Sequence, residues 1–384
     1  MVSVAFGVAA LIFAAGFIEY IYFAMREGTI RSRIGHIQIA QRGYFESGRA
    51  DPFRFVLPSA AAERGLIEKT GGVVSVGQRI EFSGLASLGD STISFIGEAI
   101  EPGKEAELSE AIVVSAGRNL ADDDRDGAVL GEGLAANLGA RVGDRLVLLV
   151  NTPSGGINAA EVTVLGLFSS ATKAFDDAAL RVTLPLAQRL LRLDGAHLWV
   201  VALRATEQTN NALRQLDSAL DPKRFDVVPW YRLADFYTKT VELFSRQVGV
   251  LKAVIALLIL LVISNTVTMN VLERTGEIGT SLAIGLSRWR VVRQFLVEGV
   301  LLGALGGLLG AIVGTAFSWA VSAIGIPMPP PPGLGRGFTA EVLATPTIVG
   351  EALLLAALSA LVASVLPAWR VSRLPIVDAL REAR

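Results

Sequence analysis

Residues 273–290 read ERTGEIGTSLAIGLSRWR, and this short stretch of mixed charge separates two long apolar segments. Within it, Ile278, Leu282 and Leu286 recur at intervals of four residues, which is the spacing of one face of a helix. The pattern predicts an amphipathic helix. Such a helix either lies at a membrane interface or inserts into the groove of a partner, and the composition leaves both alternatives open.

On either side of this stretch the chain carries apolar segments long enough to cross the hydrocarbon core of a bilayer, which takes about 20 residues. The first segment has no Lys or Arg before it and no small-residue cleavage site after it, so we expect a retained helix and not a signal peptide. The predicted fold is four transmembrane α-helices with a large α+β extracytoplasmic domain inserted between helices 1 and 2. The predicted order is a transmembrane helix at 1–25, the α+β domain at 26–246, transmembrane helix 2 at 247–272, a cytoplasmic helix at 273–293, transmembrane helix 3 at 294–326, a Pro-rich outer loop at 327–346, transmembrane helix 4 at 347–367 and a cytoplasmic tail at 368–384.

Charge is distributed unevenly along the 384 residues. Segment 26–246 carries 25 Lys and Arg with 28 Asp and Glu, as expected of a water-facing domain, whereas the rest of the chain carries only 10 basic and 8 acidic residues. Arginines gather in the connection 272–294 and in the tail after Pro367. Because basic residues in short loops mark the cytoplasmic side, we place both segments there and the domain 26–246 on the other side of the membrane.

The domain 26–246 shows alternating apolar segments bounded by turn formers. We predict an unbroken stalk helix from Trp230 into the second span, because nothing after that residue breaks a helix. Other predicted elements are strands at 36–40, 73–80, 92–96, 145–150, 161–168, 199–203 and 225–228, helices at 129–138, 185–193 and 207–220, and a hairpin loop at 151–156.

The domain offers little catalytic chemistry. It has no cysteine, which excludes disulfides and thiolate catalysis, and the net charge of −1 does not provide the basic field of a nucleic-acid-binding protein. His36 and His197 are far apart in the sequence, and we interpret both as hydrogen-bonded histidines of the sheet. Segment 122–127 begins like a calcium loop, but Gly133 stands where the twelfth ligand should be Glu, so we expect a solvated acidic turn without a metal.

The third span is rich in glycine. Its spacing forms two overlapping tracks of small residues, which permit close approach of helix backbones. The tracks are Gly299, Gly303 and Gly307, and Gly306, Gly310 and Gly314. Two interpretations stay open: tight packing within the chain, or a face that slides against or meets a second subunit.

Four charged residues lie within or near the spans. Lys252, Glu298 and Glu351 are close to span ends, where long side chains reach the interface without any special role. Glu19 lies near the outer end of the first span, where a plain position at the interface and a contact with cargo are the two hypotheses for it.

Residues 273–285, followed by QFLVE at 294–298 and the glycine-rich span, closely resemble the signature of MacB/FtsX-like ABC transporter permeases, which reads approximately E-R-x-x-E-I-G-x-x-x-A-x-G. The segment 367–381 resembles the family's usual ending. The run 129–135, continued to Gly143 and Asp144, is similar to its periplasmic core domain. The resemblance covers essentially the whole chain. It implies a periplasmic core domain with a porter-like and a small β-rich subdomain, in the inner membrane of a bacterium.

The resemblance also implies partners and roles. It implies a dimer with an identical or a different permease subunit, bound to two cytoplasmic ABC ATPase subunits that hold ATP and Mg. No cofactor and no catalytic or metal site is expected in this chain, which lacks a G-x-x-x-x-G-K-[ST] loop. The stalk would correspond to 25–33 and 231–247. The positions that would couple to the ATPase are Glu273, Arg274, Glu277, Ile278, Gly279, Ala283 and Gly285.

The sequence departs from the family pattern at two points. The chain opens directly into apolar residues, where family members usually have a basic amphipathic helix, which puts the cytoplasmic anchoring of the first span in doubt. Gly276 would cost about 1 kcal/mol inside a helix, so we expect the coupling helix to begin near Glu277.

Several functions fit this resemblance. The opening of the domain, GHIQI at 35–39 followed by Gly43 and Tyr44, is most similar to permeases of lipoprotein release, and we favour extraction or export of lipoprotein or another hydrophobic cargo. The alternatives are MacB-like efflux of a peptide or drug and an FtsX-like mechanotransmitter that activates a cell-wall hydrolase. A periplasmic lipoprotein, a chaperone or an outer-membrane protein would then be a further partner. A membrane-anchored binding protein without ATPase coupling remains a different class.

Overall fold

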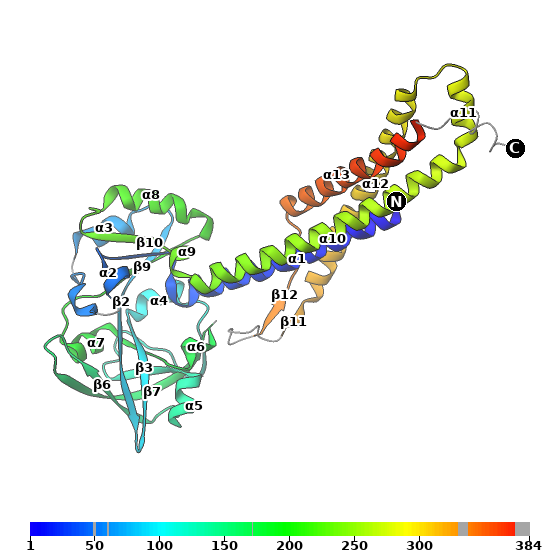
Figure 1. Ribbon diagram of the computed structural model, residues 1–384. Helices are drawn as coiled ribbons and strands as arrows, with labels where there is room; N and C mark the ends of the chain where they lie inside the picture. The colour runs from blue at the N-terminus through cyan, green and yellow to red at the C-terminus, as the bar shows by residue number, and fades with distance from the viewer. Residues whose placement is uncertain (49–50, 60, 171, 329–336, 373–384) are drawn as a thin grey trace. The chain divides into compact units, whose positions relative to one another are not determined.

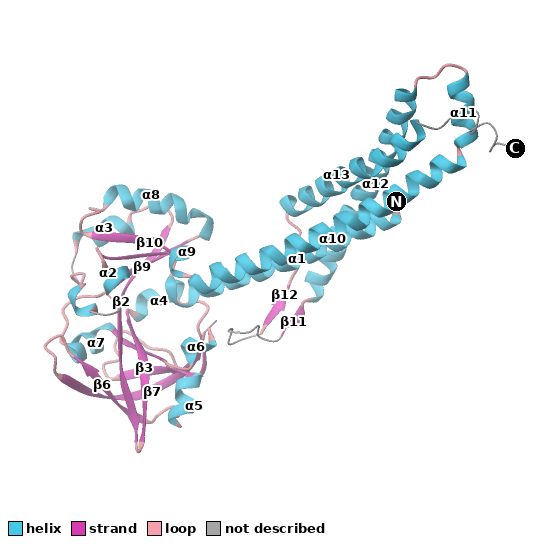
Figure 2. Ribbon diagram, viewed as in Figure 1, coloured by secondary structure: helices cyan, strands magenta, loops and turns pink. Residues whose placement is uncertain are grey.

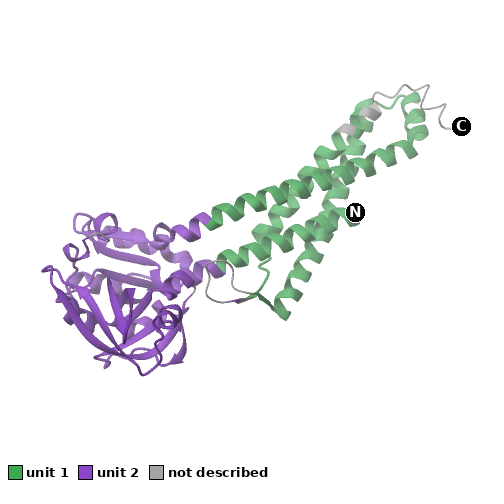
Figure 3. Ribbon diagram, turned by 60° about the horizontal axis from the view of Figure 1, so that its bottom comes forward, with its two compact units in different colours: residues 1–23, 240–328, 339–384 green, residues 24–239, 329–338 purple. Residues whose placement is uncertain are grey.

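The computed structural model describes residues 1–48, 51–59, 61–170, 172–328 and 337–372. The chain divides into two compact units (Figure 3). The helical bundle comprises the described residues of 1–23, 240–328 and 339–372, and the β-rich domain comprises those of 24–239. Residues 329–336 of the predicted Pro-rich outer loop, and the predicted tail from residue 373 onward, lie outside the described residues.

Four helices of the described chain are long and apolar enough to cross a membrane, which confirms the predicted membrane protein. They are α1 (Val2–Thr29), α10 (Asp235–Glu273), α12 (Arg288–Ile324) and α13 (Pro346–Ser372). The short helix α11 (Thr275–Ala283) joins α10 to α12, and the strands β11 (Ile326–Met328) and β12 (Phe338–Ala340) form a small sheet (Figure 2).

The glycines of α12 decide how the bundle packs. A methyl group at Gly303 would overlap the side chain of Ala360 on α13, and one at Gly310 would overlap the backbone of Ala5 on α1. The first predicted glycine track therefore faces α13 and the second faces α1. A Cβ atom added to Gly314 would lie only 2.8 Å from the Ala9 Cα of α1. Both tracks pack against helices of the same chain.

In the β-rich domain, strands β1–β10 form one mixed sheet (Figure 1). The order is β10-β1-β9-β2-β3-β8-β5-β7-β4, with β6 pairing β2 and β7; the β3–β8 and β5–β7 pairs are parallel and the others are antiparallel. The bounds are β1 Ile37–Gln41, β2 Val73–Leu88, β3 Ser91–Ile100, β4 Val113–Gly117, β5 Gly127–Gly131, β6 Arg145–Asn151, β7 Ile157–Ser169, β8 Ala179–Thr183, β9 Leu198–Leu203 and β10 Phe225–Pro229.

Short helices lie between these strands. They are α2 Tyr44–Ser47, α3 Ala62–Glu68, α4 Glu105–Leu108, α5 Glu132–Leu138, α6 Lys173–Asp176, α7 Leu184–Leu191, α8 Thr209–Ala219 and α9 Trp230–Leu233. Three 3₁₀ turns occupy Pro52–Arg54, Pro102–Lys104 and Thr206–Gln208, and α1 continues into the domain as the π-helical segment η1 (Ile30–Ile34).

The long strand β2 joins two hydrophobic cores. Its first half pairs with β9, and Val76 belongs to the core that contains Trp199. Its second half pairs with β3 and β6, and Phe82 belongs to the core that contains Phe95. Arg79 lies at the crossing point, opposite Leu198 of β9 on one side and Ile100 of β3 on the other. A charged side chain thus lies buried between two apolar cores.

The structure confirms the predicted hairpin at 151–156 but corrects three predictions. The first part of the helix expected at 129–138 is strand β5, because β7 and β8 pair with it on its two edges. The stalk helix is interrupted at Ala234, which is buried with Ile30 and Trp230. The fourth long helix does not end at Pro367 but continues to Ser372.

Candidate functional site

The segment that the sequence singled out forms α11 and the turn after it. Ile278 and Leu282 are each 8% exposed and belong to the apolar core of the bundle, and Gly279 is buried beside them. Two of the three residues of the apolar stripe predicted to face a membrane or a partner therefore pack in the chain's own helical bundle, whereas the third, Leu286, is exposed. α11 begins at Thr275, before the predicted start near Glu277, because the Thr275 hydroxyl donates to the Val271 carbonyl oxygen at 2.9 Å and anchors the turn.

The predicted single helix at 273–293 is divided in two. α11 ends at Ala283, and Gly285 adopts a φ of +102°, a conformation that favours glycine and ends the helix. α12 then starts at Arg288. The remaining positions expected to couple to an ATPase all lie on the exposed side of this turn: Glu273, Arg274, Glu277, Ala283 and Gly285. The Arg274 guanidinium and the Glu277 carboxylate pair there at 3.3 Å.

Next to them lie three exposed apolar side chains that the sequence reasoning did not single out as site residues. Ile284 is 83% exposed, Trp289 is 68% exposed and Leu286 is 37% exposed. We call these three residues the exposed patch. Ile284 and Trp289 fall outside the four-residue spacing of the buried stripe, and that mismatch is the sequence signal that separates them from it. Large apolar side chains grouped on a surface indicate an interaction site.

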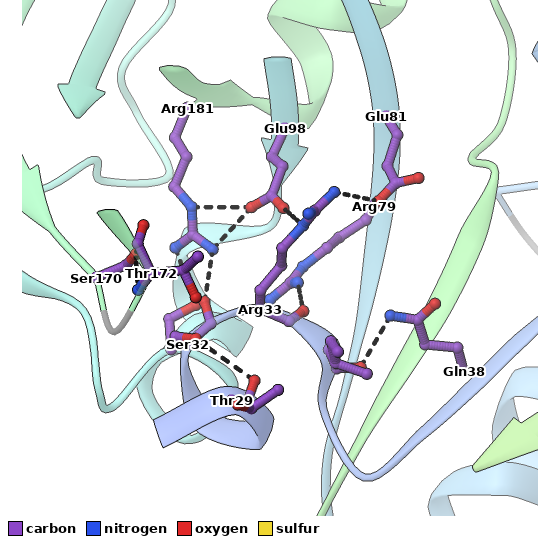
Figure 4. Close-up of polar contacts among 12 residues, drawn as sticks. Thr29, Ser32, Arg33, Gln38, Arg79, Glu81, Glu98, Ser170, Thr172 and Arg181 are labelled. Carbon is purple, nitrogen blue, oxygen red and sulfur yellow. Dashed lines mark hydrogen bonds and ion pairs between the residues drawn. The ribbon is translucent and has the colours of Figure 1, made fainter. Parts of the chain in front are cut away.

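A second notable feature lies in the β-rich domain, where the end of α1 meets the sheet. Three guanidinium groups and three carboxylates come together there, and Figure 4 shows the three arginines with two of the carboxylates, Glu81 and Glu98. We call this group the ion network: Arg33, Arg79, Arg181, Glu81, Glu98 and Glu105. The side chains of Arg79, Arg181, Glu98 and Glu105 are all less than 5% exposed. Buried charges of this kind are retained only where they are paired.

Strand register sets up half of the network. Glu98 of β3 lies opposite Glu81 of β2 on one side and opposite Arg181 of β8 on the other. The Arg181 guanidinium donates to the Glu98 carboxylate through Nε at 3.1 Å and Nη2 at 2.9 Å. Side by side across β2, β3 and β8 there are therefore two adjacent carboxylates, of Glu81 and Glu98, and one guanidinium, of Arg181. Like charges placed directly opposite each other destabilise a sheet, so this row requires a further cation.

Arg33 of η1 supplies that cation. Its Nε donates to Glu98 Oε1 at 2.8 Å, and its Nη2 donates to Glu81 Oε1 at 3.2 Å, so one guanidinium bridges the two carboxylates. The Tyr44 hydroxyl donates to the other oxygen of Glu81 at 3.2 Å. The charges of the network balance only when the end of α1 is in place.

The backbone of η1 is held as well. Arg181 Nη2 donates to the Ser32 carbonyl oxygen at 3.2 Å, and Arg79 donates through Nη1 to the Arg33 carbonyl oxygen. The carbonyls at the end of a helix lack partners within the helix, so these two arginines satisfy groups that would otherwise be left unpaired. Arg79 is in turn fixed by Glu105, whose carboxylate accepts from Nε and Nη2 at 2.9–3.1 Å.

The electrostatics of Glu98 reflect this enclosure. Burial alone would raise the pKa of the Glu98 carboxyl, but the positive charges of Arg181, Arg79 and Arg33 outweigh it and lower the pKa to about 2. Glu98 is therefore ionised throughout the physiological range.

Both histidines are buried, and His36 is hydrogen-bonded through both ring nitrogens as expected, whereas the buried Nε2 of His197 has no hydrogen-bond partner among the described residues. His36 Nδ1 accepts a hydrogen bond from the Leu203 amide at 3.1 Å, and its Nε2 lies 3.1 Å from the Thr206 hydroxyl. His197 Nδ1 accepts from the Glu81 amide at 3.3 Å. Burial lowers the pKa of each imidazole to about 4.

The acidic turn 122–127 shows no metal-binding arrangement. The Asp124 carboxylate pairs with the Arg118 guanidinium at 2.6 Å, and Asp122 accepts a hydrogen bond from the Gly103 amide. Across the part of the chain that the structure describes, no group of three or more His, Asp or Glu side chains is arranged to hold a metal ion.

Glu19, for which a cargo contact is one of two hypotheses, lies in the helical bundle and lines a cavity of about 440 Å³. Lys252 of α10 and Glu351 of α13 line the same cavity and pair with each other at 2.5 Å. Glu298 lies elsewhere and accepts a hydrogen bond from the Asn270 amide group at 2.9 Å. Three of the four charged residues noted in the spans, Glu19, Lys252 and Glu351, thus line the same cavity.

Two family models match the chain. Residues 1–219 match the MacB-like periplasmic core domain, and residues 249–376 match the FtsX-like permease C-terminal domain. Together the two matches take in α1, the β-rich domain up to the end of α8, α10 from residue 249 onward, α11, α12 and α13.

Curated relatives and solved structures are similar to parts of the chain. The macrolide export ATP-binding/permease protein MacB of Syntrophobacter fumaroxidans is 32% identical over 55% of this chain and 28% of its own length. The lipoprotein-releasing system transmembrane protein LolC of Xylella fastidiosa is 28% identical over 66% of this chain and 64% of its own length. The chain thus spans less than two thirds of either relative. The periplasmic region of MacB from Actinobacillus actinomycetemcomitans covers 56% of this chain and 95% of that one, with 16% identity and a TM-score of 0.38.

Proposed function

Because the chain belongs to the permease family with a MacB-like periplasmic core domain and an FtsX-like C-terminal domain, we propose that it is a permease subunit of an ABC transporter. In this proposal a separate cytoplasmic ATPase hydrolyses ATP, and the permease converts that hydrolysis into motion of the β-rich domain. The motion extracts or exports lipoprotein or another hydrophobic cargo. The protein resides in a bacterial inner membrane with the β-rich domain in the periplasm.

The observation that carries the proposal is the attachment of α1 to the sheet. A helix can transmit a displacement only where its end is held firmly. Arg33 is held by two carboxylates, and the carbonyls of Ser32 and Arg33 are held by two buried guanidiniums. The Arg33 side chain is 40% exposed, but its partner Glu98 is only 1% exposed, so withdrawal of Arg33 would leave a buried carboxylate with one cation fewer. A displacement of η1 would therefore move strands β2, β3 and β8 with it.

The exposed patch supports an ATPase as the partner. Ile284, Leu286 and Trp289 are presented by a glycine turn whose neighbouring helix, α11, is packed into the bundle through Ile278 and Leu282. A partner that binds the patch would push on α11 and hence on the transmembrane helices. Aromatic and aliphatic anchors with adjacent exposed charges are typical of such interfaces.

The choice of cargo rests on the relatives. One is named for the release of lipoproteins and another for the export of macrolides, and both cargo classes are hydrophobic or amphipathic. We favour lipoprotein, because the LolC match extends over a larger share of the relative's own length than the MacB matches do. MacB-like efflux is the alternative that the other relative supports. An FtsX-like mechanotransmitter that activates a cell-wall hydrolase would use the same link without moving cargo.

The test is purification of the full chain from native membranes in mild detergent, followed by mass spectrometry of the proteins and lipids that accompany it. We expect an ABC ATPase and a lipoprotein. In the variant Ile284→Asp/Trp289→Asp the ATPase should be lost, whereas the matched variant Val142→Asp, an exposed apolar residue of the β-rich domain, should retain it.

Other outcomes would replace the proposal. A hydrolase or its activator together with the ATPase would favour mechanotransmission without transport. Absence of any ATPase from the wild-type preparation in several detergents would refute the permease function itself. Retention of the ATPase by the Ile284→Asp/Trp289→Asp variant would remove the exposed patch from the interface, and Glu273→Ala/Glu277→Ala would then test the charged side of the same turn.

A further inference from the structure

The cavity in the helical bundle, which we call the membrane pocket, is formed by three helices. Its volume is about 440 Å³. It combines apolar walls with a charged interior, since it is lined by Ala15, Ile18, Glu19 and Tyr22 of α1, Ser245, Val248, Gly249 and Lys252 of α10, and Thr345, Thr347, Ile348 and Glu351 at the start of α13. Ionisable side chains in membrane-spanning helices are costly and mark functional sites by default.

One ion pair is already complete in this pocket. Lys252 Nζ donates to Glu351 Oε2 at 2.5 Å and so joins α10 to α13. Both side chains remain partly exposed, at 35% and 53%. The pair therefore faces the pocket and is not enclosed between the helices. Its single positive charge is matched by the Glu351 carboxylate.

Glu19 adds a second carboxylate. Its side chain is exposed and takes part in no ion pair with any other residue that the structure describes. The formal charges of Glu19, Lys252 and Glu351 thus sum to one negative charge. The Tyr22 hydroxyl beside them lies 3.4 Å from the Ser245 hydroxyl and the Val241 carbonyl oxygen, so the polar side of the pocket continues from α1 to α10.

We propose that the membrane pocket binds the ammonium head of an amphiphile, with Glu19 as its counter-ion and the apolar walls against the first part of its chain. The charge sum selects a cation, because an anion would meet two carboxylates and a lysine that is already paired. The apolar lining and the position on membrane-spanning helices select a ligand with a hydrocarbon tail. A primary amine can also donate to Glu351 and to the Tyr22 hydroxyl oxygen, whereas a quaternary ammonium cannot.

Such an amine has two sources: the headgroup of an aminophospholipid, or the amino group of an amphiphilic cargo. Binding does not require that the amphiphile be transported, and only the cargo case rests on the proposed function. The two ideas can fail separately, because binding is measured on the chain without any ATPase, whereas the proposed function is tested by association with the ATPase.

The experiment uses the full chain in nanodiscs of phosphatidylcholine and compares stearylamine with stearic acid, each carrying a nitroxide on the hydrocarbon chain. Electron paramagnetic resonance gives the fraction of probe immobilised by the protein. We expect preference for stearylamine in the wild type. Glu19→Gln should lower that preference about two- to fivefold, the range for one partly exposed charge pair. Glu19→Lys should reverse it in favour of stearic acid.

The matched control is Glu298→Gln, which removes a carboxylate of α12 that is hydrogen-bonded to Asn270 outside the pocket. This variant should keep the wild-type preference. Equal immobilisation of the two probes by the wild type would overturn the proposal, and so would an effect of Glu298→Gln as large as that of Glu19→Gln. Displacement of stearylamine by added phosphatidylethanolamine, but not by phosphatidylglycerol, would identify the bilayer lipid as the source; failure of both lipids to displace it would identify a separate amphiphile.

Discussion

Arg181 and Glu98 face each other across the parallel strands β8 and β3, with Nη2 and Oε2 2.9 Å apart and both side chains less than 5% exposed. The pair is the centre of the ion network, because Arg33 of the stalk reaches the other oxygen of Glu98 at 2.8 Å. A single carboxylate thus receives a guanidinium from the sheet and another from the end of α1. This geometry makes the stability of the domain dependent on the position of the stalk.

The substitution Arg181→Met should destabilise the β-rich domain by about 3–5 kcal/mol, because it leaves the buried Glu98 carboxylate without its sheet partner. Thermal unfolding of the full chain in detergent, followed by tryptophan fluorescence, measures the loss. The double variant Arg181→Met/Glu98→Leu should recover part of the stability, since it removes the charge as well as its partner. A double variant as unstable as the sum of its single variants would show that the two residues act independently.

The substitution Arg33→Gln should uncouple ATP hydrolysis from cargo release. The β-rich domain keeps its buried pairs in this variant, but α1 loses its bridge to Glu81 and Glu98. In a reconstituted complex we expect the ATPase rate to be retained while cargo release falls about tenfold, the effect of roughly 1.4 kcal/mol. Arg145→Gln, which breaks an exposed ion pair with Glu161 in the same domain, serves as the control and should release cargo normally. Equal release by both variants would exclude the ion network as the mechanical link.

The variant Gly310→Ala should destabilise the helical bundle by about 1–3 kcal/mol, the cost of overpacking, because the added methyl group would overlap the Ala5 backbone of α1. Gly350→Ala is the matched control in α13, where an added methyl group meets no atom within 4 Å of the described structure. Thermal denaturation of the two variants in the same detergent compares them directly. A similar midpoint for both would mean that α1 and α12 do not pack as closely as the structure shows.

Stability should fall as the pH drops from about 6.5 towards 4. Burial lowers the pKa of His36 and His197 to about 4, so the unfolded chain binds protons in this range that the folded domain does not. The contribution of both histidines is complete above the unfolded pKa and is lost as the pH falls towards the folded pKa. His36→Asn/His197→Asn, which offers an amide oxygen in place of each acceptor nitrogen, should flatten the dependence of the unfolding midpoint between pH 6.5 and 4.5. The contribution of Glu98 is separable, because its depressed pKa of about 2 places its loss below pH 4.5.

Much of the architecture followed from local patterns. The four spans, the α+β insertion and the hairpin of β6 and β7 were all predicted, because each depends on residues that are close together in sequence. The prediction of a helix at 129–138 was wrong for Val129 and Leu130, because pairing with β7 and β8 overrides the local helix preference of these residues. Residues 275–283 do form a short helix between two spans, but Ile278 is buried and Ile284 is exposed, and periodicity alone does not say what an apolar stripe packs against.

The sequence by itself determined that this is a membrane protein with one large water-facing insertion, because hydrophobicity summed over about 20 residues decides whether a segment can enter a bilayer. Only the tertiary structure decided that Arg33 meets Glu98, 65 residues away, and that Arg181 meets it from 83 residues away in the opposite direction. It likewise decided that Glu19, Lys252 and Glu351 share one pocket. Contacts between residues so far apart in sequence depend on strand order, register and helix packing, which no local pattern of charge or hydrophobicity specifies.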